Sequence, residues 1–465
     1  MSTGTTDTPS EQAVFSTITR RIVPLLFCCY LVAFLDRVNV GFAKLQMATE
    51  LQMSDAVYGF GAGIFFLGYF LFEVPSNLAL ERVGARLWIA RIMFTWAIVS
   101  GAFAFVAEIP WGPLPALFGL PRTAFSFYAL RFLLGVAEAG FFPGIILYLT
   151  YWYPNARRAK AVAMFMTAVA AANVIGAPLS GAIMQFADGR FGWSGWRWLF
   201  LLEAVPSICA AFVVLRVMQD GPATAPWLTP DERAVAQAAL DRDHRGPPPR
   251  ESVQQVNRAR AALTDGRVWA LAFVYLSSNL ALYGVNFWMP TLVQELGVAK
   301  TDFLRIGLIS MIPWGTAGAV MVAVGTHSDK SGERRWHAAL SLLVAAIGMT
   351  LLGIVGHAAV MSIVALTCVT CGILSFDAAF WAIPTAFLRA SAAAAGIAWI
   401  NSIGNLGGQF GPDLIGRIRT RTGSGDMAFL VIAALVTVGA IVVLLATRHR
   451  DASTLPNDPV LIPAV

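Results

Sequence analysis

Four charged residues lie inside long apolar stretches of the sequence, and their types and spacing could carry out chemistry. Asp36 and Arg37 are adjacent in CCYLVAFLDRVNVGFAK, and Arg131 and Glu138 are seven residues apart in FYALRFLLGVAEAGFFPG. On a helix, that spacing of seven gives two turns and one shared face, whereas neighbouring residues point about 100° apart. Arginine forks bind carboxylates bidentately and stay protonated, and buried carboxyl groups can carry protons. The pattern predicts a site for a carboxylate anion beside proton-carrying acids.

The elements that must position these residues are membrane-spanning helices. Hydrophobic residues make up 57% of the chain and charged residues only 13%, which a soluble protein of 465 residues does not tolerate. Uncharged stretches of about 20 residues recur along the sequence, each long enough to cross the bilayer core. A charge within such a stretch costs roughly 2.5–3.5 kcal/mol on insertion scales, so it marks a functional site by default.

Apolar runs predict an all-α membrane protein with twelve transmembrane helices in two pseudo-symmetric bundles of six. The even number places both termini on one side, and the distribution of Lys and Arg assigns that side to the cytoplasm. We expect a polar N-terminus (1–20), a first bundle (21–218), a flexible cytoplasmic linker (219–266), a second bundle (267–447) and a cytoplasmic tail (448–465). The expected spans are 21–43, 56–79, 86–107, 126–149, 158–186, 196–218, 267–292, 303–325, 337–356, 360–388, 392–416 and 427–447.

A repeated loop relates the two halves. NLALERVGAR after the second span matches GTHSDKSGER after the eighth, with an acid, a base, a glycine and an arginine at the same places. Paired charges at helix ends, next to a glycine turn, suit a latch that closes in one conformation and opens in another. We therefore predict gating loops, although the charges could merely mark the water interface; their residues are Glu81, Arg82, Arg86, Asp329, Lys330 and Arg334.

Other polar residues occur at mid-span depth. Tyr69, Asn401 and Asn405 are candidates to line the substrate path, although buried amides also join helices to one another. Glu73, Glu203 and Asp377 are further acids within apolar runs, and their roles stay open at this point. No set of residues for nucleophilic catalysis, phosphate binding or metal binding is apparent, so we expect no enzyme activity, no cofactor and no metal.

Taken together, the motifs resemble the major facilitator superfamily and, within it, the anion:cation symporter family. The resemblance rests on FLDRVNVGFA, FEVPSN, RFLLGVAEAGFFPG, GWRWLFLLEAVP, YGVNFWMPT, HSDKSGERRWH and INSIGNLGGQFGP. It implies that Arg37 and Arg131 contact a substrate carboxylate and that Asp36 and Glu138 handle protons. It also implies that four residues lie near the ligand: Tyr69, Trp381, Asn401 and Asn405. The sequence departs from the family pattern at Asn77, Asp377, Gln409 and Asp413. Of these, Asp377 and Gln409 leave the polar end of the substrate open.

From these observations we expect a proton-coupled importer of a small organic anion, such as a sugar acid, a dicarboxylate or an aromatic acid. The expected partners are this anion, a proton and membrane lipid, with no nucleic acid, and the expected form is a monomer in a bacterial-type inner membrane. A facilitator or exporter of the same fold, or a membrane sensor that binds an anion without transport, remains an alternative. The sequence does not distinguish among the organic anions.

Overall fold

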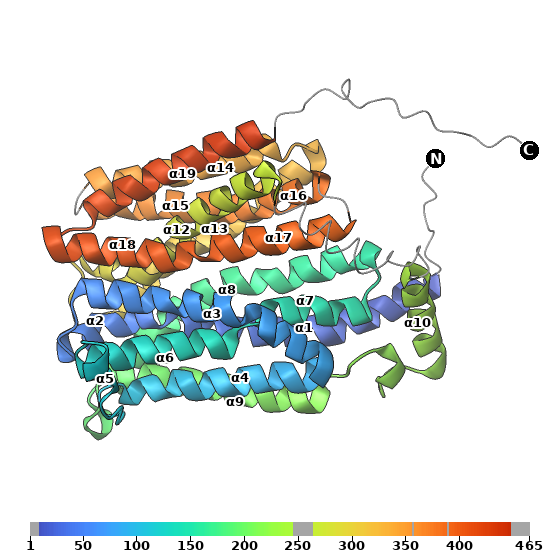
Figure 1. Ribbon diagram of the computed structural model, residues 1–465, viewed down its shortest axis with the longest axis horizontal. Helices are drawn as coiled ribbons and strands as arrows, with labels where there is room; N and C mark the ends of the chain where they lie inside the picture. The colour runs from blue at the N-terminus through green and yellow to red at the C-terminus, as the bar shows by residue number, and fades with distance from the viewer. Residues whose placement is uncertain (1–8, 245–263, 356–357, 388–389, 448–465) are drawn as a thin grey trace, which may run out of the picture.

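The computed structural model describes residues 9–244, 264–355, 358–387 and 390–447, and the described part is almost entirely helical. Two layers of long helices lie side by side with their axes roughly parallel (Figure 1). The expected tail 448–465 lies outside the described residues.

The first layer, blue to green in Figure 1, contains helices α1 to α9. Their bounds are α1 (Pro9–Val38), α2 (Val40–Glu50), α3 (Asp55–Val83), α4 (Ala85–Ala102), α5 (Leu114–Leu117), α6 (Arg122–Glu138), α7 (Phe141–Trp152), α8 (Asn155–Ala187) and α9 (Gly195–Val217), with 3-10 turns η1 (Phe103–Phe105) and η2 (Arg190–Gly192).

The second layer, yellow to red in Figure 1, contains helices α12 to α19. Their bounds are α12 (Gly266–Gln294), α13 (Phe303–Ser331), α14 (Arg335–Ile354), α15 (Ala359–Phe380), α16 (Ala382–Phe387), α17 (Ala390–Asn405), α18 (Gly407–Thr422) and α19 (Asp426–Ala446). We call the end of the molecule that contains the start of α1 and the end of α19 the termini end, and the opposite end the far end.

Several expected spans are interrupted in the structure. The expected span 126–149 is divided into α6 and α7 at Gly140, which has a positive φ of 83°, and a Cβ there would lie 2.4 Å from Ser76 Oγ. The expected span 392–416 is divided at Leu406 into α17 and α18, each of 16 residues. In the described residues, eleven helical stretches are individually long and apolar enough to cross a membrane. Helices α17 and α18 together cover the expected span 392–416, but neither is among these eleven stretches.

The two layers pack tightly where glycines allow their backbones to touch. A Cβ on Gly63 of α3 would lie 2.5 Å from Gln409 O of α18, and one on Gly307 of α13 would lie 2.3 Å from Ala177 O of α8. A Cβ on Gly181 of α8 would lie 2.4 Å from Phe303 O of α13. These contacts extend from the far end to about the middle of the molecule, so the far end is closed.

The linker contains an ordered helix that the expectation of a flexible connector did not include. This helix, α10 (Pro230–His244), follows the 3-10 turn η3 (Pro222–Thr224) and packs against the start of α1 at the termini end (Figure 1). It begins with a capping box, in which Glu232 accepts a hydrogen bond from Thr229 N at 2.8 Å and Glu232 N donates to Thr229 Oγ1 at 3.3 Å. Residues 245–263 of the expected linker lie outside the described residues.

Candidate functional site

Arg37 and Glu138 form a buried ion pair in the middle of the first layer. Arg37 is the second-last residue of α1 and is 8% exposed, while Glu138 is the last residue of α6 and is 2% exposed. A guanidinium nitrogen of Arg37 donates directly to the Glu138 carboxylate. The Nε of Arg37 has no hydrogen-bond partner among the described residues, so this arginine retains donor capacity for a ligand.

Arg131 lies close to the same pair and is 1% exposed. It donates to Ala62 O at 2.7 Å, and its Nε has no hydrogen-bond partner among the described residues. The guanidinium carbons of Arg37 and Arg131 each lie 5.2 Å from the centre of the Phe65 ring. The two arginines therefore share one aromatic side chain, and a single acid, Glu138, offsets their combined charge.

Asp36 faces away from the arginines, as expected for adjacent residues on a helix. Its carboxylate accepts hydrogen bonds from Trp96 Nε1 at 3.1 Å, Ser100 Oγ at 2.9 Å and Ser207 Oγ at 2.6 Å. These donors come from α4 and α9, so Asp36 lies between α1 and the outer helices. The two acids expected to handle protons thus occupy different environments, one paired with arginine and the other surrounded by neutral donors.

The residues expected near the ligand lie in two groups. Tyr69 is 7% exposed, and its ring centre is 6.0 Å from the Arg37 guanidinium, so it belongs to the arginine cluster. Trp381 lies in the second layer at the break between α15 and α16, where its ring is 4.9 Å from that of Tyr275. Asn401 and Asn405 are half-buried on α17, which packs against α12. Within the part of the chain that the structure describes, no hydrogen bond or ion pair joins Asn401 or Asn405 to the arginine cluster.

The first expected gating loop has a tight turn at Gly84, with a φ of 94°. Arg86 Nε donates to Leu215 O at 2.7 Å, and Arg86 N donates to Asp220 Oδ1 at 3.3 Å, which holds this loop to the end of α9. Glu81 and Arg82 are exposed and make no ion pair among the described residues.

The second expected gating loop turns at Gly332, with a φ of 69°. Arg334 pairs with Asp329, and Lys330 is exposed. Glu333 accepts a hydrogen bond from Trp336 N at 2.8 Å at the start of α14. Although partial burial opposes ionisation, this bond and the contacts with His337 keep the pKa of Glu333 below its ordinary value. Gly84 and Gly332 share a positive φ but differ in ψ, which is 147° at Gly84 and 0° at Gly332. Gating by the two loops stays a prediction.

A charged network at the far end was not predicted from the sequence. Lys44 Nζ lies 2.9 Å from Asp55 Oδ1, and Arg419 Nε lies 3.1 Å from Asp55 Oδ2. Arg419 also pairs with Glu295 at the end of α12. Because Lys44 and Asp55 belong to the first layer and Arg419 and Glu295 to the second, the network joins the layers. In the sequence these four residues lie near helix ends, where charged residues are common. The network becomes visible only when the structure shows that they pair across the two layers.

Glu203 is a second buried acid close to Asp36. It lies on α9, is 4% exposed and accepts a hydrogen bond from Ser180 Oγ at 2.7 Å. Its Oε2 has no hydrogen-bond partner among the described residues. The sequence identified this acid within an apolar run but gave no indication of its proximity to Asp36.

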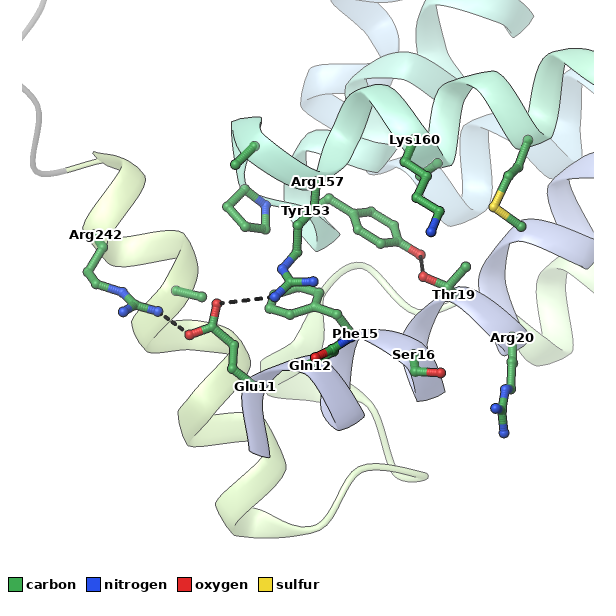
Figure 2. A pocket seen from close by; sticks show the side chains of 15 residues that line it. Glu11, Gln12, Phe15, Ser16, Thr19, Arg20, Tyr153, Arg157, Lys160 and Arg242 are labelled. Carbon is green, nitrogen blue, oxygen red and sulfur yellow. Dashed lines mark hydrogen bonds and ion pairs between the residues drawn. The ribbon is translucent and has the colours of Figure 1, made fainter. Parts of the chain in front are cut away.

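A large cavity lies away from the arginine cluster, at the termini end. It has a volume of about 780 Å³ and lies between α1, α8 and α10. Figure 2 shows the Glu11 carboxylate between the guanidiniums of Arg157 and Arg242, which ties α10 to α1 and α8. Arg20 at this cavity and Arg37 are both on α1, about 25 Å apart by helical rise. The cavity is thus separate from the buried site.

Comparison with known proteins identifies the family. The family model described as Major Facilitator Superfamily matches residues 26–412. The chain belongs to the major facilitator superfamily. A protein of Agrobacterium vitis named "Putative tartrate transporter" is 47% identical over 94% of this chain and 95% of that protein. A protein of Pseudomonas putida named "Putative metabolite transport protein NicT" is 40% identical over 93% of this chain and 94% of that protein.

The solved structures agree with this assignment to the major facilitator superfamily. A bacterial homologue of the human lysosomal transporter Spinster, in an inward-facing and unoccupied conformation, matches with a TM-score of 0.70 at 16% identity. The match covers 95% of this chain and 97% of that one, and at this identity it supports the fold alone. The protein is therefore a multi-pass membrane transporter of this superfamily and not an enzyme, as the sequence predicted.

Proposed function

We propose that this transporter imports a small organic anion together with protons, and that the carboxylate of the substrate binds between Arg37 and Arg131. One observation carries the proposal: two buried guanidiniums share the Phe65 ring, and each has an Nε without a partner among the described residues. Buried donors of this kind are costly unless a ligand satisfies them. A carboxylate matches both the charge and the geometry of the arginines.

Proton coupling follows from the energy of moving the anion. Carrying one negative charge inward against 100 mV costs about 2.3 kcal/mol, and one accompanying proton cancels that cost. Glu138 can exchange protons where it meets Arg37, and Asp36 can do so within its set of neutral donors. Two such acids are sufficient for a net inward driving force.

We further propose that the protein is a monomer in the bacterial inner membrane, with its termini end facing the cytoplasm. The charged network at the far end then closes the outer side, and the described conformation faces inward. Alternating access would require this network to open while the gating loops at residues 81–86 and 329–334 come together. The bundles 21–218 and 267–447 would move as the two rocking units.

The test is uptake by the purified protein in vesicles, using a panel of organic acids with and without an imposed proton gradient. Arg37→Lys and Arg131→Lys keep the charge but lose the planar fork, so each should weaken carboxylate binding about tenfold or more. Arg305→Lys, at an exposed position of α13, is the matched control and should have no effect.

The outcomes separate the alternatives. Uptake that ignores the proton gradient would indicate a facilitator, and transport driven only in the outward direction would indicate an exporter. Binding without any flux would indicate a sensor. Unaltered affinity in both Arg→Lys variants would remove the anion site from this position.

A further inference from the structure

Asp377 is a carboxylate in the second layer for which the described residues provide no hydrogen-bond or ion-pair partner. It lies on α15 and is half-buried, and its Oδ1 atom is buried without a hydrogen bond among the described residues. No lysine or arginine of the described residues lies within ion-pair distance of it. Because an unpaired buried carboxylate oxygen is costly, this arrangement suggests that a ligand satisfies it during the transport cycle.

Three residues of α12 connect Asp377 with the arginine cluster. Tyr275, Asn279 and Tyr283 are spaced by four residues, so they lie on one face of the helix. Tyr283 is close enough to interact electrostatically with both Arg37 and Asp377, and Tyr275 interacts with Asp377 and Tyr283. Tyr30 of α1 also interacts with both Arg37 and Asp377. The acid and the arginines therefore belong to one tyrosine-lined cluster that spans both layers.

Asn279 supplies a donor next to this acceptor. It is 2% exposed, and its Nδ2 lies near the Tyr275 hydroxyl but makes no hydrogen bond of normal geometry among the described residues. Helices α12 and α15 pack against each other, which places Asn279 and Asp377 on adjoining elements. A hydroxyl group can donate a hydrogen bond to the Asp377 carboxylate and accept one from the Asn279 amide nitrogen. Hydroxyl groups would therefore satisfy both side chains.

We propose that Asp377 and Asn279 bind hydroxyl groups at the end of the substrate remote from its carboxylate. This inference rests on the proposed function, and it selects the substrate class as a hydroxylated monocarboxylate. A dicarboxylate would bring a second negative charge towards Asp377, which is unfavourable at a buried site. An ammonium group would satisfy Asp377 but would leave the amide nitrogen of Asn279 without an acceptor.

The experiment compares four ligands with the same six-carbon chain, using calorimetry on the purified full chain. The ligands are gluconate, hexanoate, adipate and 6-aminohexanoate. We expect gluconate to bind the wild type about a hundredfold more tightly than hexanoate, because a site built for hydroxyls rejects an analogue that lacks them. Adipate should bind more weakly still.

The variant Asp377→Asn removes the charge but keeps the size of the side chain. It should weaken gluconate binding about tenfold and strengthen adipate binding by a similar factor. The matched control is Asp413→Asn, because Asp413 pairs with Arg417 on the same helix, and no ion pair of the described residues joins it to the cluster. If Asp377→Asn does not fold, the ranking of the four ligands by the wild type still decides the question.

Equal or tighter binding of adipate by the wild type would overturn the inference, and so would an adipate affinity unaffected by Asp377→Asn. Tightest binding of 6-aminohexanoate would also overturn it, in favour of an ammonium site. In each of these cases the arginine site would stand, since Arg37→Lys would still weaken all four ligands. Failure of all four to bind, with no effect of Arg37→Lys, would overturn the proposed function as well.

Discussion

The guanidinium of Arg37 donates a hydrogen bond to the carboxylate of Glu138, although 101 residues separate them in the sequence. Both groups are buried, so neither can readily exchange its partner for water. A substrate carboxylate that reaches Arg37 must compete with Glu138 for the same donors. Protonation of Glu138 removes that competition, and this links proton binding to anion binding.

The variant Glu138→Gln tests this link. A neutral amide mimics the protonated acid, so Arg37 should be available to the anion at every pH. We expect substrate affinity at alkaline pH to rise about tenfold, equivalent to about 1.4 kcal/mol. Uptake driven by a proton gradient should be lost, whereas exchange of substrate across the membrane should persist. Binding titrations between pH 5 and 9 measure the first effect, and vesicle assays measure the second.

The control for this variant is Asp231→Asn, because Asp231 is an exposed acid in the first turn of α10 and lies outside the gating loops. It should leave the pH dependence of binding unchanged. If the substrate affinity of Glu138→Gln still falls at alkaline pH as in the wild type, Glu138 does not compete with the substrate for Arg37.

The environment of Asp36 leads to a prediction about stability. Trp96, Ser100 and Ser207 all donate to its carboxylate, and leucine would leave three buried donors without an acceptor. Each unsatisfied buried donor costs roughly 1–3 kcal/mol. With three such donors, Asp36→Leu should lower the free energy of unfolding by roughly 3 kcal/mol or more. Asp36→Asn retains one acceptor oxygen and should be destabilised less. Thermal unfolding of the purified variants measures the difference, and equal stability of the two would contradict the described hydrogen bonds.

The network of Lys44, Asp55, Arg419 and Glu295 predicts which substitutions open the far end. Arg419 contacts two acids, and its side chain is only 10% exposed. Arg419→Gln should therefore weaken the closed far end more than the loss of a surface ion pair would. If the substitution destabilises the conformation with the closed far end by about 1.4 kcal/mol, the ratio of closed to open molecules falls tenfold.

Spin labels at exposed Thr49 of α2 and Arg421 of α18 report this opening. In Arg419→Gln, the measured distances between the labels should shift towards longer values. Arg417→Gln is the matched control, because its ion pair with Asp413 lies within one helix. An unchanged distance distribution in Arg419→Gln would show that the network does not hold the far end closed.

The sequence predicted the fold well because bilayer thickness restricts helices to a narrow range of lengths. It also placed Asp36, Arg37, Arg131 and Glu138 correctly inside the protein, since charges in apolar runs must be buried there. It placed Arg131 and Glu138 on one helix face but did not predict that Glu138 pairs with Arg37, because that pairing depends on how α1 and α6 pack.

Two further features lay beyond the sequence argument. The break at Leu406 divides one expected span into two short helices. The hydropathy of the sequence gives no clear signal of this break. The helix α10 did have a signal, the capping box in TPDE, but the charged and proline-rich composition around it favoured a flexible linker.

The contact between Gly307 of α13 and Ala177 of α8 provides a steric test of the closed far end. A Cβ on Gly307 would lie 2.3 Å from the Ala177 backbone oxygen, which cannot move aside as a flexible side chain could. Gly307→Ala should therefore separate α8 from α13 and reduce the population that is closed at the far end. Because transport needs both conformations, uptake should fall, while an anion should still bind. Gly315→Ala is the matched control on the same helix, since a Cβ there would lie 3.9 Å from Val174 Cγ2, an ordinary contact. Equal uptake by the two variants would mean that α8 and α13 do not need this close approach during the cycle.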